Sequence, residues 1–445
     1  IVLWLFVGAV FLTLRLRFVN IRGFRHALQV VRGRYDDPSD AGEVSHFQAL
    51  ASALSATVGL GNIAGVALAV KMGGPGAIFW MLVAAVFGMT AKFAECSMGV
   101  KYRTIDAEGH VMGGPMRYLR AGLEKRGLGP LGVVLSVMFA LFCIGGSFGG
   151  GNMFQANQAY SALNEALENY GGHHLPKELF GVLLVVAVGA VILGGFRRIA
   201  RTAEKIVPLM CGMYVLAAGF IVLTHLAELP AALGLIVSDA FTGDAVGGGL
   251  LGAMIMGIRR AAFSNEAGIG SAAIAHSAAR TKEPIREGYV ALLEPFIDTI
   301  IVCLATGLVI VVSGVTLDPA NADLDGAVLT MRAFEETISW FPLVLTTAIV
   351  LFAYSTMISW SYYGERCWTM LFGARSSTSY RVVFLVFVFI GSVSQLSNVL
   401  DFSDLMILSM AFPNILGLYI LSSELRADAA DYENRLREGR FFVRG

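Results

Sequence analysis

Charged residues are scarce in this sequence. They make up 15% of its 445 positions, against about 25% in soluble proteins. Basic and acidic residues number 33 each, so no overall basic field would attract nucleic acid, and we predict no nucleic-acid partner. The five cysteines stand singly, without C-x-x-C spacing, and are interpreted as packing residues. H-E-x-x-H and Walker A motifs are missing, which argues against an enzyme and an ATP-driven pump.

Hydrophobic residues, in contrast, account for 56% of the chain and gather in long runs. An apolar run of about 18 residues or more is typical of a transmembrane helix. The first run begins at Ile1 without a basic n-region or a cleavage site, so we interpret it as a span and not as a signal peptide. We predict an all-α polytopic membrane protein with eleven transmembrane helices, a leading helix followed by helices one to ten, near residues 1–14, 46–70, 76–99, 131–160, 179–195, 206–227, 247–278, 288–314, 342–371, 380–398 and 403–422.

Basic residues orient these helices, because segments rich in lysine and arginine stay in the cytoplasm. Most of the 33 basic residues fall in alternate connecting segments and in the tail. We therefore predict a multi-pass protein of the cell inner (plasma) membrane, with its N-terminus outside and its C-terminus cytoplasmic. Residues 19–35 mix arginines with apolar side chains, which fits an amphipathic interfacial helix or an ordinary basic loop.

Two of the runs contain glycine and polar residues where a helix is disfavoured. Helix one includes Ala-Thr-Val-Gly-Leu-Gly-Asn (56–62), and helix six includes Ser-Asn-Glu-Ala-Gly-Ile-Gly (264–270). The glycines could simply permit close helix packing. However, irregular backbone survives in lipid only where it lines a cavity, and transporters place their binding sites at such broken helices. Because the breaks open two successive five-helix sets of opposite orientation, we predict a single transporter domain built as an inverted repeat, with a leading segment 1–35, a first repeat 42–227, a second repeat 247–422 and a cytoplasmic tail 423–445.

Several stretches resemble the sodium:alanine symporters, also called alanine or glycine:cation symporters, of the amino acid-polyamine-cation superfamily: GEVSHFQALASALSATVGLGNIAGVALAV (42–70), GGPGAIFWM (73–81), FSNEAGIGSA (263–272), FIDTIIVC (296–303) and FAYSTMISWSYYGER (352–366). The resemblance implies the five-plus-five fold of the bacterial leucine transporter with one extra leading helix. It also implies sodium-coupled uptake of a small neutral amino acid, alanine or glycine, by alternating access. Leu60 and Ala261 stand where the family most often has threonine and glycine, which leaves the preference among small amino acids open.

A sodium site is expected where helix eight faces the first break. The Phe352 carbonyl and the Ser355 and Thr356 hydroxyls have the i, i+3, i+4 spacing of one helix face. The Ser55 and Val58 carbonyls would complete a shell that resembles the sodium site shared across the fold. Alternatively, the two hydroxyls bond carbonyls of their own helix.

The amino-acid site is expected at the same break, formed by residues Thr57, Gly59, Gly61 and Asn62. Amides at Gly59 and Gly61 would meet the substrate carboxylate, since a broken helix presents free N–H groups and a positive dipole end. Acceptors for the ammonium would come from Asn62, from helix-six carbonyls near Phe263 and Ser264, and from Gln155. The resemblance places a substrate-binding glutamine on the helix of Gln155. Phe263 and Trp360 would close the side-chain end of the cavity, although an aromatic in a membrane helix is more often plain packing.

Other intramembrane ionisable residues leave alternatives open. Glu266 could carry a proton or accept hydrogen bonds from unwound amides. Structural ion pairing suits Lys92, Glu95 and Asp298 better than a proton relay. An outer gate could form between Arg259 or Arg260 and Asp401 or Asp404, and His276 is expected near the interface. We expect sodium, the amino acid and membrane lipid as partners and a functional monomer. A proton-coupled transporter is the main alternative, and an ion channel is less favoured because no ring of pore residues repeats.

Overall fold

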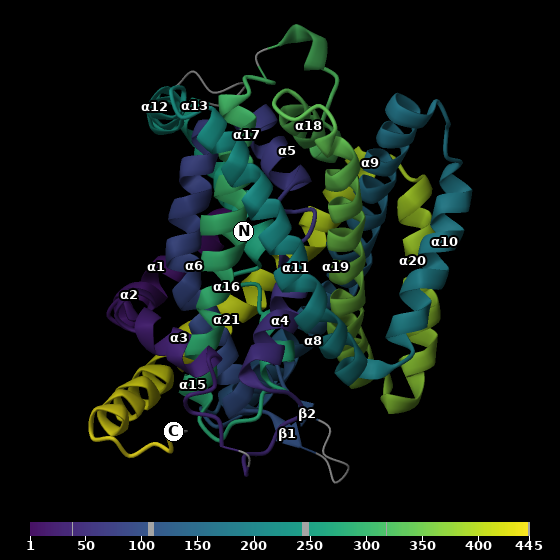
Figure 1. The fold of residues 1–445 in the computed structure, drawn as a ribbon. Coiled ribbons are helices and arrows are strands. Elements are labelled where there is room, and N and C mark those ends of the chain that lie inside the picture. Colours follow the sequence, from purple (N-terminus) through teal and green to yellow (C-terminus); the bar gives the residue numbers. More distant parts are fainter. Residues whose placement is uncertain (38, 106–110, 243–248, 317, 444–445) are drawn as a thin grey trace.

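The computed structural model describes residues 1–37, 39–105, 111–242, 249–316 and 318–443, and this part of the chain is nearly all helical. One short hairpin is the exception, in which β1 (Thr104–Ile105) pairs antiparallel with β2 (Val111–Met112). The long helices run roughly side by side between the hairpin at one end of the molecule and α12 and α18 at the other (Figure 1). A nearly all-helical fold agrees with the sequence prediction.

The first half of the chain starts with an apolar helix and two short helices that cover the amphipathic segment 19–35, where Ala27 and Val30 are buried. That segment is therefore largely helical. The elements of this half are α1 (Val2–Arg15), α2 (Val19–Arg22), α3 (Phe24–Val31), α4 (His46–Thr57), α5 (Ala64–Gly73), α6 (Gly76–Lys101), α7 (Pro115–Glu124), α8 (Gly129–Phe148), the π-helix η1 (Gly149–Met153), α9 (Phe154–Gly171), α10 (Lys177–Ile192), α11 (Gly195–Thr224) and α12 (Leu229–Asp239).

The second half ends in a long helix that continues well into the expected tail. Its elements are α13 (Gly249–Asn265), α14 (Ala272–His276), α15 (Pro284–Ala291), α16 (Leu293–Pro295), the π-helix η2 (Phe296–Cys303), α17 (Leu304–Val312), η3 (Pro319–Asn321), α18 (Gly326–Glu335), α19 (Phe341–Phe372), η4 (Ala374–Ser376), α20 (Ser377–Val393) and α21 (Leu396–Arg437). Residues 106–110 of the expected first repeat, residues 247, 248 and 317 of the second repeat and residues 444 and 445 of the tail lie outside the described part.

Seven helices of the described residues are long and apolar enough to cross a membrane: Gly76–Lys101, Gly129–Gly171, Gly195–Thr224, Pro284–Val312, Phe341–Phe372, Ala374–Val393 and Leu396–Arg437. The other four expected spans correspond to shorter helices. α1 has 14 residues and α10 has 16, and the remaining two are divided into α4 with α5 and α13 with α14. The chain is a multi-pass membrane protein, while the count of eleven spans stays a prediction.

The two divided helices lie inside the bundle. Every residue from Ala49 to Val70 is buried, and so is every residue from Gly257 to Ala279 except Arg259. In contrast, α10, α11 and α20 expose large apolar side chains such as Val186, Leu216 and Val382, and α10 and α20 form one edge of the molecule (Figure 1). An apolar exterior suits lipid contact, and a buried polar interior suits a site.

The C-terminal part of α21 packs against α3 and the α14–α15 loop. The Tyr432 hydroxyl lies 2.8 Å from Nε2 of His26, and the Arg435 guanidinium pairs with Glu283 at 2.7 Å. Burial, together with the nearby Arg286, lowers the pKa of His26 to about 4. His26 is therefore neutral at ordinary pH, and the expected tail is an ordered, docked element as far as Arg437.

Candidate ion and substrate site

The first break separates α4 from α5. Its backbone leaves the helix at Val58, with φ −77° and ψ 87°. The N–H of Gly59 donates to Oδ1 of Asn62 at 2.9 Å, and the N–H of Leu60 donates to Oε1 of Gln155 at 3.1 Å. Among the described residues, the N–H of Gly61 has no acceptor. Side chains thus satisfy two of the amides that the break frees, and the Gly61 amide is among those left open for a ligand.

The second break separates α13 from α14. Glu266, Gly268 and Gly270 have positive φ angles of 55°, 80° and 96°, which a regular helix cannot contain. Asn265 caps the turn by accepting the N–H of Ala267 at 3.0 Å. Asn414 of α21 donates to the Gly268 carbonyl at 2.9 Å. The second break is therefore also held by side chains, one of them from another helix.

The Glu266 carboxylate accepts hydrogen bonds from Nε1 of Trp360 at 2.8 Å and from the Ser271 hydroxyl. Its observed partners are therefore side chains, where the sequence suggested unwound amides. Trp360 is 1% exposed, and its indole N–H already has this buried partner.

Asp298 of η2 joins the two breaks. Its carboxylate accepts from Nδ2 of Asn62 at 2.6 Å and from the Ser264 hydroxyl at 2.9 Å, and it also accepts from its neighbour Thr299 at 2.7 Å. The sequence suggested an ion pair for Asp298, but the hydrogen-bond donors observed around this fully buried carboxylate are neutral. In the sequence, Asp298 stands out only as an acidic residue inside an apolar run, which does not reveal its partners.

The proposed sodium ligands come together at the contact of α4 with α19. The Thr356 hydroxyl donates across to the Ser55 carbonyl at 3.1 Å, and the Ser55 hydroxyl donates to the Ser355 carbonyl at 2.9 Å. The Ser355 hydroxyl bonds back to Phe352 at 3.0 Å, as the alternative for that residue anticipated. Val58 is buried at the end of α4 beside this cluster.

Glycines let the surrounding elements approach the first break. A Cβ built on Gly61 would lie 3.2 Å from Cα of Ser264 and 3.5 Å from the Phe263 ring, and one built on Gly150 would lie 3.1 Å from the same ring. Nε2 of Gln155 donates to the Gly150 carbonyl at 2.8 Å. Six of the expected substrate residues therefore lie together: Gly59, Gly61, Asn62, Gln155, Phe263 and Ser264. The other two have different contacts. Trp360 lies beside Glu266, and the Thr57 hydroxyl donates to the Ala53 carbonyl of its own helix at 3.2 Å.

An ion-pair cluster covers the end of α13 next to Phe263. Arg259 pairs with Asp404 at 2.6 Å, and Arg260 pairs with the same carboxylate. The Arg260 guanidinium also lies 5.1 Å from the centre of the Phe263 ring. Of the two acidic candidates, Asp404 is the partner, while Asp401 is exposed.

The expected position of His276 near the interface is wrong, because its side chain is fully buried among acidic partners.

Comparisons with known proteins agree with this picture. The model of the sodium:alanine symporter family matches residues 1–443. The sodium/alanine symporter AgcS of Methanococcus maripaludis is 42% identical over 430 residues, which cover 96% of this chain and 93% of that protein. The probable sodium/glutamine symporter GlnT of Bacillus subtilis is 34% identical over 444 residues, with 99% and 89% covered. Among solved structures, a Na⁺-coupled sialic acid symporter in a substrate-bound outward-open state has the same fold, with a TM-score of 0.56 at 17% identity over 94% of this chain and 86% of that one.

Proposed function

The chain belongs to the sodium:alanine symporter family, which is a transporter family and not an enzyme family, and from this premise we propose that it takes up a small neutral amino acid together with sodium by alternating access. Alanine and/or glycine are the proposed substrates, on the strength of the relative that is named a sodium/alanine symporter. The observation that carries the proposal is the meeting of two breaks, α4–α5 and α13–α14, around buried neutral oxygens and an amide without an acceptor.

The proposed architecture is a leading helix, α1, followed by a five-plus-five inverted repeat of the leucine-transporter type with eleven spans and broken first and sixth core helices. It rests on the two interrupted helices and on the fold shared with a solved transporter. The basic segments place the N-terminus outside and the C-terminus in the cytoplasm. We propose that the monomer, surrounded by lipid in the inner membrane, is the functional unit.

Sodium is proposed to bind between α4 and α19, to the carbonyls of Ser55, Val58 and Phe352 and the hydroxyls of Ser355 and Thr356. Hard cations prefer oxygen ligands, and these groups bring in no net charge. The hydroxyl protons now point to carbonyl oxygens. Turning them away would present hydroxyl lone pairs and free the carbonyl oxygens, so the residues fit a small monovalent cation.

The amino acid is proposed to lie against the first break. Its carboxylate would bind the open Gly61 amide, with Thr57 and Gly59 shaping the adjacent backbone, and its ammonium would bind carbonyls of the Phe263–Ser264 segment and the side-chain oxygens of Asn62 and Gln155. Phe263 and Trp360 would limit the side chain to a hydrogen or a methyl group. Enlarging an occupant of a packed site costs about 1–3 kcal/mol, enough to disfavour leucine roughly tenfold or more.

Uptake of radiolabelled alanine into proteoliposomes tests the function. We expect accumulation only when an inward sodium gradient is imposed, and competition by glycine. Accumulation that is driven by a proton gradient, with potassium replacing sodium on both sides, would show that the proton-coupled alternative is correct. Alanine flux that follows only its own gradient and never accumulates would favour a channel.

A further inference from the structure

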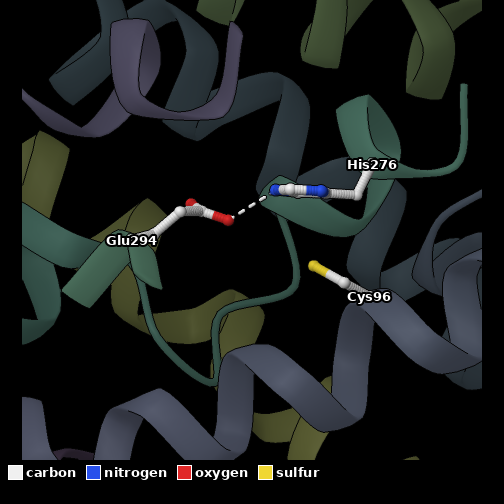
Figure 2. Close-up of side chains that lie close together, drawn as sticks. All are labelled: Cys96, His276 and Glu294. Atoms are coloured by element: carbon white, nitrogen blue, oxygen red, sulfur yellow. Dashed lines mark hydrogen bonds and ion pairs between the residues drawn. The ribbon is translucent and has the colours of Figure 1, made fainter. Parts of the chain in front are cut away.

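A chain of buried ionisable residues lies outside the proposed ion and substrate site. His276 of α14 is at its centre, with Nδ1 2.5 Å from Oε1 of Glu287 and Nε2 2.7 Å from Oε1 of Glu294. All three side chains are fully buried. Figure 2 shows the imidazole pointing at Glu294 with the Cys96 thiol nearby.

This geometry fixes where protons can be. A neutral imidazole carries one N–H, and its second nitrogen is an acceptor. Here both ring nitrogens of His276 face carboxylate oxygens, which are acceptors when ionised. Both contacts can be hydrogen bonds only if one extra proton is present, and an imidazolium between two carboxylates places it where both bonds are charge-assisted. The cluster is therefore built around a bound proton.

The groups around His276 come from every element packed on α14. Lys92 of α6 pairs with Glu294 at 3.1 Å and with Glu95 at 3.9 Å. His46 of α4 pairs with the second oxygen of Glu287. Cys96 of α6 and Tyr363 of α19 complete the surroundings.

Donor atoms of Cys96, His276 and Glu294 lie within 4.8 Å of one another, a spacing that could hold a metal ion. The Lys92 ammonium, however, is already 3.1 Å from the other oxygen of Glu294. A divalent cation at this point would face a like charge in a buried site, where charge repulsion is weakly screened. A proton is therefore the ligand that the cluster fits best.

The cluster is connected in two directions. On one side, Nε2 of His46 is buried without a hydrogen-bond partner among the described residues and lies 3.9 Å from Oδ1 of the partly exposed Asp36. On the other side, Glu95 accepts from Asn414, which also donates to the Gly268 carbonyl of the second break. The path runs from the face with the basic segments to the α13–α14 break.

We propose that His276, with Glu287 and Glu294, is a proton-binding site that ties α4, α14 and α15–α16 together in the cytoplasmic half, and that loss of its proton to the cytoplasm promotes opening on that side. The reason is electrostatic. Without the proton, two buried carboxylates flank a neutral ring, and one hydrogen bond between elements is lost. This inference rests on the proposed transport function and orientation, and it adds a site for a second cation, the proton.

A first experiment observes the proton directly, without transport. In the detergent-solubilised full chain labelled with ¹⁵N-histidine, both ring nitrogens of His276 should have the chemical shifts of protonated nitrogens at pH 7.5. The His276→Gln variant, which lacks this ring, assigns the signals. An unprotonated ring nitrogen on His276 at this pH overturns the proposal.

A second experiment measures coupling in right-side-out proteoliposomes with a fixed sodium gradient. Raising the lumenal pH from 7 to 9 should raise the rate of alanine release into the lumen several-fold in the unmodified protein. His276→Gln should abolish this response, whereas the matched control His173→Gln should keep it. If His276→Gln does not fold, Glu294→Gln, which leaves one flanking carboxylate, should shift the response toward neutral pH. Sodium-driven uptake that is unaffected by lumenal pH overturns the inference and leaves the transport function standing.

Discussion

At the scale of single residues, the site depends on side chains that replace missing backbone partners. Gln155 uses both ends of its amide. Its oxygen accepts from Leu60 in the first break, and its nitrogen donates to Gly150 in η1. Because the residue is 3% exposed, neither bond can be exchanged for one to bulk water. Gln155 thus connects α9 to Leu60, the residue that precedes the Gly61 amide.

Replacing Gln155 with alanine should weaken the binding of alanine, glycine and serine by a similar factor, on the order of tenfold. The loss of a partner leaves a buried donor unsatisfied, which costs about 1–3 kcal/mol. Competition for radiolabelled alanine uptake measures the effect. The matched control is Ser161→Ala, because Ser161 lies on the same helix and its hydroxyl donates to the Asn157 carbonyl of that helix at 3.1 Å. If Gln155→Ala and Ser161→Ala behave alike, Gln155 does not touch the substrate.

Single residues also show what the sequence could predict. Polar residues inside apolar runs were found readily, because their cost in lipid makes them stand out. Their partners were not, because pairing depends on how distant helices pack. Trp360 was assigned from its size alone, and its bond to Glu266 needs the contact of α19 with the second break. His276 was misplaced for the same reason, since its partners lie on α15 and α16.

At the scale of elements, each side of the site is flanked by a π-helix. η1 precedes Gln155, and η2 contains Asp298 and Thr299. Such segments are frequent at functional sites because the wider turn redirects side chains. Hydrophobic periodicity indicated helices in both regions but carries no signal for a change from i+4 to i+5 bonding. The helices and the family could therefore be predicted from the sequence, whereas the local geometry of the site could not.

The contact of α4 with α19 should control the sodium dependence. Ser355→Ala with Thr356→Ala removes two of about five proposed oxygen ligands, so the sodium concentration for half-maximal alanine uptake should rise at least several-fold. Ser361→Ala is the control, since Ser361 is on the same helix and its hydroxyl bonds Ile358 at 2.7 Å. If the folded double variant has the same sodium dependence as the parent, α19 does not supply ligands to the sodium ion.

At the scale of the whole molecule, three buried charge systems lie at different depths. The Arg259–Arg260–Asp404 cluster covers the site next to Phe263. Asp298 connects the two breaks, and the His276 cluster lies beyond the second break toward the face with the basic segments. A charge without its partner is costly inside a protein. The three systems therefore define which contacts must separate if the site is to open to one side or the other.

The Arg259–Arg260–Asp404 cluster gives the clearest test of such opening. Asp404→Asn should favour the outward-open form, because it leaves the buried Arg260 without its carboxylate. Cys303 is a built-in reporter, since its sulfur lies 3.3 Å from Asn62 and from Ser264 and is buried in this structure. In a chain whose other four cysteines are alanine, a membrane-impermeant thiol reagent added outside should label Cys303 about tenfold faster in Asp404→Asn than in the parent. Breaking a buried pair costs about 3–5 kcal/mol, which would permit an even larger change.

The control is Asp401→Asn, one turn away and exposed. Equal labelling rates in all three proteins would mean that the arginine cluster fixes the fold of this end and does not gate the site.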